Sequence, residues 1–336
     1  FVNSILKIRM KKILITGATG FIGKSICKYL LTSGRSFRGA VRSTNLDLSN
    51  TNIKYISVGE IGPNTKWNVA LEGVDCVIHC AGRAHVMKET KTDELKIYRS
   101  VNVDGTRQLA EQAAKAGVKR LVFLSSVKVN GEVTIKKQND SSKNDIKKKT
   151  IFKHSDSPNP EDSYAISKLE AEKMLWDLSA KIGLEVVVVR LPLVYGEGVK
   201  GNLARLIKLV KSNIFLPLSL IRNQRSMIGI DNLVDLLICC CEHPNAFGKT
   251  FLASDGEDLS TPKLINHIAS SMGRRARLFP FPIFLLKFLG SILGKKKEIN
   301  RLVESLVIDS NYTKDTLNWT STISVEEGIR RMVNGK

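Results

Sequence analysis

The sequence predicts an α/β fold in which a doubly wound parallel sheet is followed by a smaller C-terminal substrate-binding domain. Apolar strand-like runs alternate with helical periods over the first 194 residues, a glycine-rich turn follows the first of these runs, and the alternation weakens beyond Tyr195. Strands that alternate with helices form parallel sheets with helices on both faces. With 336 residues, 43% hydrophobic and 25% charged, the chain has the composition of a globular protein of one or two domains.

The expected elements follow one another in a regular order. The apolar run at residues 13–15 is a strand, and Ile26, Leu30 and Leu31 after the turn have helical spacing. The β-branched run at 186–190 is typical of a strand buried on both faces. Further strands are expected at residues 37–41, 74–80 and 121–125, and further helices at 101–117 and 163–184.

The turn after the first strand has three glycines spaced three residues apart. Glycines in this position allow a tight turn, let the backbone approach a pyrophosphate, and let the helix pack on the strand. The N–H groups at the start of the helix then face the anion. The turn therefore predicts a Rossmann-type dinucleotide site, with these cofactor-binding residues: Gly17, Thr19, Gly20, Phe21, Ile22 and Gly23.

The end of the second predicted strand distinguishes between the two nicotinamide cofactors. An acidic side chain there would bind the ribose 2′-hydroxyl of NAD, but Arg42 occupies this place. A guanidinium suits a 2′-phosphate. The sequence therefore favours NADP(H) over NAD(H); the alternative is that Arg42 stacks on the adenine.

A tyrosine and a lysine at the start of the long predicted helix are candidates for catalysis. Tyr164 and Lys168 are four residues apart, so they share one helical face. The ammonium and a positive nicotinamide ring are expected to lower the pKa of the Tyr164 hydroxyl, which would exchange a proton with a sugar hydroxyl or ketone as hydride moves. Ser126 ends a strand at the expected ligand-binding edge, where its hydroxyl would hold the same substrate oxygen.

With these motifs, the sequence resembles the extended short-chain dehydrogenase/reductase superfamily, in its nucleotide-sugar epimerase/dehydratase branch, from Met10 to about Met332. The resemblance implies that Ser126, Tyr164 and Lys168 are catalytic and that Lys168 also holds the nicotinamide ribose. It implies a cofactor domain over 10–194, with returning segments around 228–253, and a substrate domain over 195–336. It adds as cofactor-binding residues Cys80, Ala81, Gly82, Asn102 and Pro192, and as substrate-binding residues Ser125, Ser126, Asn202 and Arg225.

The resemblance limits the reaction to carbon 4 of a nucleotide sugar. Members that dehydrate sugars carry an Asp-Glu pair after the catalytic hydroxyl residue, whereas this chain has Val127-Lys128. The segments 82–87 and 125–131 resemble a subgroup of O-antigen and capsule biosynthesis. We expect an NADPH-dependent reductase of a UDP-4-keto-6-deoxy-N-acetylhexosamine; the alternatives are a UDP-glucose or UDP-N-acetylglucosamine 4-epimerase with tightly bound NAD, and a non-catalytic NADP(H)-sensing binding protein.

The charge and the remaining segments bear on partners and location. The net charge of +20 suggests anionic ligands, but no nucleic-acid module accompanies it, so no nucleic-acid partner is expected. A lysine-rich segment at 132–160 is interpreted as a solvated, mobile loop. The six cysteines lie in apolar stretches without metal-ligand spacing, so we expect buried thiols and no metal site. We further expect a homodimer.

The apolar segment 279–293 is followed by three lysines at 295–297. We interpret it as a core helix of the substrate domain. The alternative is a helix that lies in an anionic membrane surface, which would make a polyprenyl-diphosphate sugar a candidate substrate. We therefore expect a cytoplasmic protein. The alternative is a cytoplasmic protein that contacts the inner face of the membrane. Met10 resembles a natural start, and residues 1–9 are excluded from the predicted fold.

Overall fold

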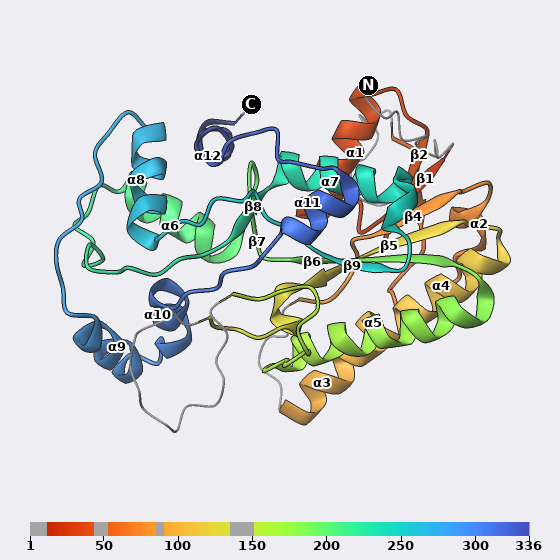
Figure 1. Cartoon of the computed structure of the whole chain (residues 1–336), viewed down its shortest axis with the longest axis horizontal. Coiled ribbons are helices and arrows are strands. Elements are labelled where there is room, and N and C mark those ends of the chain that lie inside the picture. Colours follow the sequence, from red (N-terminus) through yellow and green to blue (C-terminus); the bar gives the residue numbers. More distant parts are fainter. Residues whose placement is uncertain (1–11, 44–52, 85–90, 135–150, 336) are drawn as a thin grey trace.

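A computed structural model describes residues 12–43, 53–84, 91–134 and 151–335 of the chain (Figure 1). Two predicted segments lie partly outside these residues. They are residues 85–87 of the segment 82–87, and the lysines between 136 and 149 of the lysine-rich segment. The described residues form a large parallel sheet with helices on both faces, joined to a second group of helices at the left of Figure 1.

The large sheet has seven parallel strands in the order β3-β2-β1-β4-β5-β6-β9. This is the doubly wound order with one further strand at the edge, so the predicted fold class is confirmed. From β1 the strands are added first towards one edge of the sheet, as β2 and β3, and then from β4 onward towards the other edge. Ligands of such sheets bind between β1 and β4, where this order reverses, beyond the carboxyl ends of the strands. The strands are β1 (Ile13–Thr16), β2 (Phe37–Val41), β3 (Tyr55–Ser57), β4 (Cys76–His79), β5 (Arg120–Ser126), β6 (Glu185–Leu191) and β9 (Lys249–Leu252).

Two hydrophobic cores cover the two faces of this sheet. Alternate residues of each strand enter opposite cores, as Ile13 and Leu14 do in β1. One face packs on α1 (Phe21–Thr32), α7 (Ile230–Glu242) and α11 (Asn311–Leu317), and the other on α2 (Asn68–Leu71), α4 (Gly105–Lys115) and α5 (Ser163–Ile182) (Figure 1). α3 (Lys91–Arg99) lies beside α5. Leu317 and Trp319 pack in the first core, although they fall within the expected substrate domain.

The helix expected at 101–117 begins differently. Residues Ser100–Asp104 form a π-helical turn that leads directly into α4. The turn carries Asn102, which is buried, and at its end Gly105 lies so close to Ile61 that a Cβ there would come within 2.6 Å of its Cγ2. π-helical turns are frequent at functional sites.

A third hydrophobic core holds the C-terminal group of helices together. Its residues come from the two-stranded parallel sheet of β7 (Leu193–Tyr195) and β8 (Met227–Gly229) and from the surrounding helices. These helices are α6 (Gly201–Lys211), α8 (Thr261–Ser271), α9 (Ile283–Ile292), α10 (Lys296–Val303) and α12 (Val325–Asn334). Tyr195 is fully buried, because Gly229 and Gly328 leave room for its ring.

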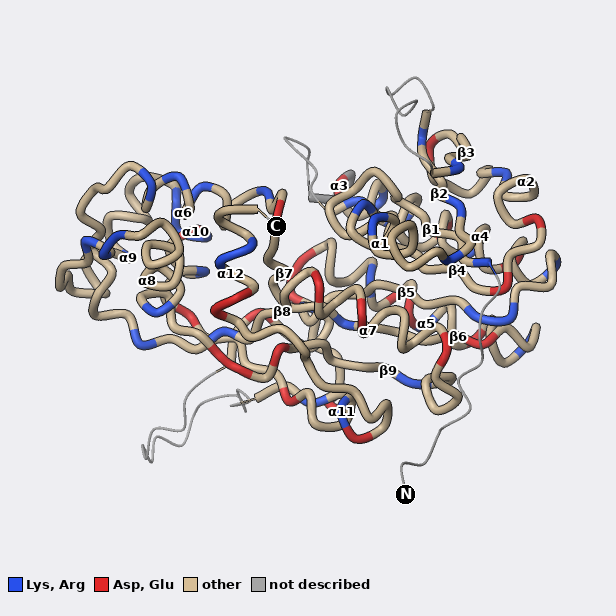
Figure 2. The backbone as a smooth tube through the Cα atoms, turned by 90° about the horizontal axis from the view of Figure 1, so that it is seen from above, with Lys and Arg blue, Asp and Glu red and all other residues tan. Residues whose placement is uncertain are grey.

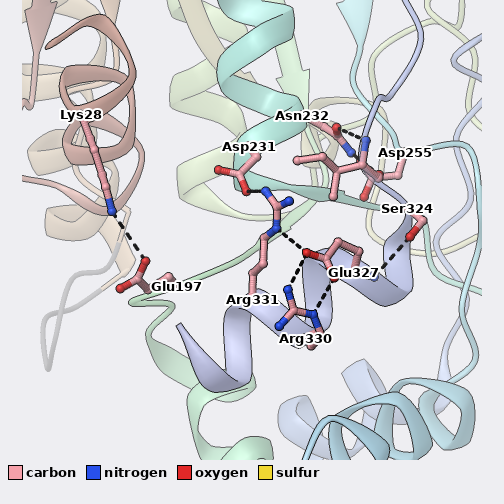
Figure 3. A network of polar contacts seen from close by, with 10 residues as sticks. Lys28, Glu197, Asp231, Asn232, Asp255, Ser324, Glu327, Arg330 and Arg331 are labelled. Atoms are coloured by element: carbon pink, nitrogen blue, oxygen red, sulfur yellow. Dashed lines mark hydrogen bonds and ion pairs between the residues drawn. The ribbon is translucent and has the colours of Figure 1, made fainter. Parts of the chain in front are cut away.

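Polar contacts fasten α12 to the first turn of α7 (Figure 3). Arg331 donates to Asp231 Oδ2 at 3.0 Å and to Glu327 Oε1 at 2.7 Å. Beside this pair, Asn232 donates to Asp255 at 2.7 Å, and Asp255 also accepts hydrogen bonds from the Tyr195 hydroxyl and the Gly229 N–H, each at 2.8 Å. Asp255 therefore joins β7, β8 and α7 at one buried carboxylate.

The lysine-rich segment is not a solvated loop at its two described ends. Thr134 is buried and bridges to Ser305, and Phe152 is buried and bridges to Ile308. The ring of His154 stacks on Tyr312 with centroids 3.6 Å apart. The expectation for 132–160 is therefore wrong at these residues, because hydrogen bonds hold Thr134, and ring packing and a backbone bridge hold His154 and Phe152, to the chain at 305–312.

The interpretation of residues 279–293 as a core helix is also wrong. Of the residues in α9, Leu286 and Gly290 are buried, whereas Phe284 and Phe288 are 70% and 61% exposed. The i, i+4 spacing of the exposed rings places them on one face. Among the described residues, the model has no helix long and apolar enough to cross a membrane.

The cysteines form no disulfide. All six are free thiols, and Cys27, Cys76, Cys240 and Cys241 are buried. Burial raises the pKa of Cys27 to about 12, and it raises the pKa values of Cys240 and Cys241 as well. Cys27, Cys240 and Cys241 are therefore protonated and unreactive at neutral pH.

Candidate active site

The glycine-rich turn has the geometry that a dinucleotide requires. Gly17 has φ +63°, and a Cβ there would lie 3.0 Å from the backbone of Ala81. A Cβ at Gly23 would lie 2.2 Å from the Gly17 oxygen, so helix α1 packs directly on the turn. No side chain caps the start of α1 at Gly20, so the N–H groups of its first turn are available to an anion. Thr19, Phe21 and Ile22 are half-buried around this opening.

A chain of hydrogen bonds joins β1, β4 and α4 beside this turn. Thr16 Oγ1 accepts from the Ala81 N–H at 3.1 Å and lies 2.7 Å from His79 Nδ1, while His79 Nε2 lies 3.0 Å from Thr106 Oγ1. The Thr106 hydroxyl donates to the Asn102 carbonyl at 2.7 Å. Because the Thr106 hydroxyl uses its hydrogen on Asn102, it accepts from His79 Nε2, which therefore carries the ring proton. His79 Nδ1 then accepts from the Thr16 hydroxyl, and the ring is neutral.

Neutral His79 makes the stability of the protein depend on pH. Burial, and secondarily the charge of Lys168, lowers the pKa of His79 to about 3. The unfolded chain binds this proton below about pH 6.5 and the folded chain does not, so stability falls as pH falls from about 6.5 towards 3. Between pH 7 and 5 we expect a loss of about 2 kcal/mol in the free energy of unfolding.

Urea unfolding at the two pH values measures this loss, and His79→Gln is the comparison. The variant is expected to be less stable at pH 7, because it breaks the hydrogen-bond chain, yet to lose about 2 kcal/mol less than the wild type on going to pH 5. Equal pH dependence in the two proteins would contradict a neutral His79.

The next loop brings Gly82, Asn102 and Lys168 together. Asn102 holds the loop, because its side chain accepts from the Arg83 N–H at 2.9 Å and donates to the Arg83 carbonyl at 3.1 Å and to Ser167 Oγ at 3.0 Å. A Cβ at Gly82 would lie 3.1 Å from Asn102 Oδ1 and 3.5 Å from Lys168 Nζ. Gly82 itself is exposed. A ligand at this edge of the sheet could therefore approach Lys168 at a place that a larger side chain at residue 82 would fill.

The catalytic candidates lie where β5 and α5 meet. Lys168 is buried, and its Nζ donates to the Leu124 carbonyl at 2.7 Å and sits 4.3 Å above the Phe123 ring. Tyr164 is one helical turn away and half-buried. Ser126 ends β5, is 9% exposed, and accepts from the Lys128 N–H at 3.3 Å. The structure thus brings all three predicted residues to one sheet edge, although no hydrogen bond in the described part of the chain joins Tyr164 to Ser126.

The expected lowering of the Tyr164 pKa is wrong for the chain by itself. Burial raises the pKa of Tyr164, and the charge of Asp162 and the nearby Tyr98 raise it further. Burial also lowers the pKa of Lys168 to about 8. The Lys168 ammonium donates to the Leu124 carbonyl rather than to the tyrosine, so the Tyr164 hydroxyl lacks the hydrogen bond from a cation that would lower its pKa.

Asp162 fixes the start of α5. Its carboxylate accepts from the Ala165 N–H at 2.7 Å and forms an ion pair with Lys128, which also pairs with Glu132. Burial alone would raise the pKa of Asp162, but the hydrogen bonds from Lys128 and Ala165 lower it overall. Lys128, which stands where a dehydratase has an acid, therefore ties the residues after β5 to the helix that carries Tyr164.

The prediction that Ser125 binds substrate is wrong. Successive side chains of a strand point to opposite faces, so Ser125 points away from the side of Ser126. Its hydroxyl donates to the carboxylate of Glu172, which is 2% exposed and forms an ion pair with Arg190 at 2.6 Å. Arg190 in turn donates to Asn130 at 3.0 Å. Ser125 therefore belongs to a buried network under α5.

Arg42 lies at the end of β2 as expected, but it has a partner. Its Nη1 is 3.4 Å from Glu60 Oε1, and the two side chains are 75% and 82% exposed. An ion pair as exposed as this one contributes little to the stability of the fold. It nevertheless places the carboxylate of Glu60, which follows β3, beside the guanidinium at the end of β2.

The remaining predicted residues lie farther around the site. Cys80 packs into the core, so its thiol faces the interior, and Pro192 is buried between β6 and β7. Asn202 is exposed in the first turn of α6. Arg225 is half-buried and donates through Nη1 to the carbonyls of Arg301 and Glu304, each at 3.2 Å. Within the described ranges no contact brings Asn202 and Arg225 together, so their binding of substrate stays a prediction.

Comparison with known proteins identifies the family. A model of the NAD-dependent epimerase/dehydratase family matches residues 13–253. The chain belongs to this family. A UDP-glucose 4-epimerase of Vibrio cholerae is 40% identical over 96% of this chain and 94% of its own length. An N-acetyl-α-D-glucosaminyl-diphospho-ditrans,octacis-undecaprenol 4-epimerase of Escherichia coli O157:H7 is 24% identical over 86% of this chain and 82% of its own.

Solved structures agree with the fold of this epimerase/dehydratase family member. The UDP-glucuronic acid 4-epimerase of Bacillus cereus, in complex with NAD, has a TM-score of 0.73 at 20% identity and covers 96% of both chains. The UDP-glucose 4-epimerase of Thermotoga maritima, with UDP-glucose, has a TM-score of 0.71 at 20% identity and covers 96% of this chain and 98% of its own. The resemblance seen in the sequence is confirmed.

Several residues that build the site of this family member were not identified individually from the sequence. Thr16, His79 and Thr106 hold the loop at Ala81, and Glu172 pairs with Arg190 beneath α5. The resemblance placed His79 in the segment that lines the cofactor, but its hydrogen-bond partners were not predicted, although a polar residue at the end of an otherwise apolar strand must find partners when it is buried. Glu172 follows Lys168 by four residues, a spacing that places it on the same helical face.

Proposed function

We propose that the protein is an NAD-dependent UDP-sugar 4-epimerase. The observation that carries this is the site at the β5–α5 junction, where Ser126, Tyr164 and Lys168 lie at one edge of the sheet and Lys168 Nζ is 3.5 Å from the place of a Cβ at the exposed Gly82. The 40%-identical relative over nearly the whole of both chains is a UDP-glucose 4-epimerase, which supports the assignment. A homodimer in the cytoplasm belongs to the same proposal.

The residues present fit the cofactor. The turn at Gly17, Gly20 and Gly23 leaves room for a pyrophosphate against the start of α1, and Asn102 fixes the loop at Gly82. Arg42 and Glu60 would lie at the adenosine ribose. Bound NAD supplies the acceptor, and later the donor, of the hydride at carbon 4.

The chain's own residues would manage the proton. The Ser126 hydroxyl would hold the oxygen on carbon 4, and Tyr164 would accept its proton as the hydride leaves that carbon. Lys168, released from the Leu124 carbonyl, would stabilise the phenolate and bind the ribose. Once the sugar presented its other face, Tyr164 would return the proton to the oxygen on carbon 4, and the whole reaction would involve no net oxidation.

A second candidate is a 4-ketoreductase that consumes NADPH. Arg42 favours it, because a guanidinium matches a 2′-phosphate. Glu60 weakens this argument, since its carboxylate would have to be displaced or would repel the phosphate. Val127 and Lys128 replace the acidic pair that sugar dehydration requires, which disfavours a dehydratase.

Product analysis with each cofactor distinguishes the two. Purified protein is incubated with UDP-glucose, UDP-N-acetylglucosamine or a UDP-4-keto-6-deoxy sugar, each with NAD, with NADPH or with neither. We expect interconversion of a UDP-sugar and its C4 epimer, without stoichiometric consumption of a cofactor. Stoichiometric oxidation of NADPH with the 4-keto sugar, and no epimerisation, would contradict the epimerase and support the reductase.

A further inference from the structure

Helix α9 presents an apolar face to solvent. Phe284, Phe288 and Ile292 are 70%, 61% and 66% exposed, and their spacing of four residues places them in one stripe. Leu285 and Leu289, next to the stripe, are 38% and 45% exposed. Leucine, isoleucine and phenylalanine exposed together over several turns are unusual in a soluble monomer and mark an interaction surface.

The inner face of α9 is already occupied. Leu286 enters the core of the C-terminal helices. A Cβ at Gly290 would lie 2.5 Å from Ile299 Cγ1, so α10 packs closely against this side. The helix is thus held from its inner side by α10, and it lies among the C-terminal helices at the end of the molecule away from the seven-stranded sheet (Figure 1).

The surroundings of the stripe are strongly basic. Residues 261–303 contain nine Lys or Arg and one acid, Glu298. Lys295, Lys296 and Lys297 follow the helix directly and are exposed, and no ion pair is found for them among the described residues. Figure 2 shows Lys and Arg around α6, α8, α9 and α10, with little acidic charge near α9.

We propose that α9 docks on an anionic lipid bilayer. Phe284, Phe288 and Ile292 enter the boundary between headgroups and acyl chains, and the lysines at 295–297 contact lipid phosphates. The charge favours this partner over a second copy of the chain, because two copies joined at α9 would bring two basic surfaces together. The proposal does not depend on the reaction at carbon 4.

Co-sedimentation with vesicles tests the proposal. The wild type is expected to bind vesicles of phosphatidylglycerol and phosphatidylethanolamine, and to bind phosphatidylcholine vesicles weakly. Replacing Lys295, Lys296 and Lys297 together by Gln is expected to weaken binding to anionic vesicles about 100-fold. The double variant Phe284→Ser, Phe288→Ser is expected to weaken binding to a similar extent, about 100-fold.

Phe247→Ser is the matched control. Phe247 is 49% exposed but precedes β9, away from α9, so this variant is expected to bind vesicles as the wild type does. Turnover of UDP-sugar in solution and circular dichroism are measured for every variant, which separates docking from folding and from the proposed reaction. Absence of wild-type binding to anionic vesicles would overturn the proposal, as would equal loss in the control. Self-association that the Phe284→Ser, Phe288→Ser variant abolishes, without lipid binding, would assign the stripe to a second copy instead.

Discussion

Tyr164→Phe is expected to reduce the turnover of UDP-sugar by about 10³-fold while leaving cofactor binding unchanged. In the proposed reaction this hydroxyl takes the proton from the sugar, and loss of a general acid–base costs on this order. The ring remains, so its edge-to-face contact with Tyr98, with centroids 5.9 Å apart, is kept. Steady-state kinetics and calorimetric titration with NAD measure the two quantities.

Tyr312→Phe serves as the comparison for this variant. Tyr312 stacks on His154 and Phe251 away from α5, so removing its hydroxyl is expected to change turnover by less than twofold. If Tyr164→Phe retained full turnover, the assignment of the proton to Tyr164 would be refuted. If it lost NAD binding as well, the tyrosine would have a role in holding the cofactor rather than in catalysis alone.

Lys168→Met is expected to abolish turnover and yet to stabilise the protein. Lys168 is 5% exposed, and its pKa is lowered to about 8 by burial. Keeping this side chain charged at pH 7 costs about 3 kcal/mol relative to the unfolded chain. Methionine has a similar shape and no charge, so after the loss of one hydrogen bond to Leu124 we expect a net gain of about 2 kcal/mol in the free energy of unfolding.

The gain from Lys168→Met should depend on pH. The cost of the buried ammonium is fully present below about pH 8, and it disappears as pH rises from 8 towards 10.5, where both states of the wild type lose the proton. Urea unfolding at pH 7 and pH 10 measures the difference. Lys173→Met, an exposed change on the same helix, is expected to shift stability by less than about 0.5 kcal/mol. A Lys168→Met variant less stable than the wild type at pH 7 would show that the ammonium is stabilising.

The fold was predictable to a large extent because its signals are local. The glycine-rich turn and the β-branched run of β6 identify strands and a helix without reference to the rest of the chain. Residues 279–293 were misinterpreted for a physical reason. An apolar helix looks the same in sequence whether its apolar side chains face a core or solvent, and the difference appears only when α10 is seen to fill the inner side of α9.

The places of the three proposed catalytic residues were predictable, but the residues that support them were not. The conjunction of a Gly-rich turn with Tyr164 and Lys168 indicated the chemistry, since both signals lie within single elements. Ser125 was misassigned because its partner Glu172 lies 47 residues farther along the chain. Likewise the pKa of Tyr164 depends on how deeply the ring is buried, which no spacing of residues reveals.

The position of α12 has a consequence for synthesis on the ribosome. Its residues Ile329 and Met332 complete the core of the C-terminal helices, and Gly328 closes over the ring of Tyr195. The strands β1 to β6 and their helices are translated early and can pair. The apolar surface of α6 and α8 stays uncovered until α12 is made, more than 50 residues after α8 ends. During this interval the nascent chain exposes apolar surface, which promotes aggregation and is bound by chaperones. Folding of this third core is therefore expected to be the slowest step, and the one most prone to aggregation, in the synthesis of this protein.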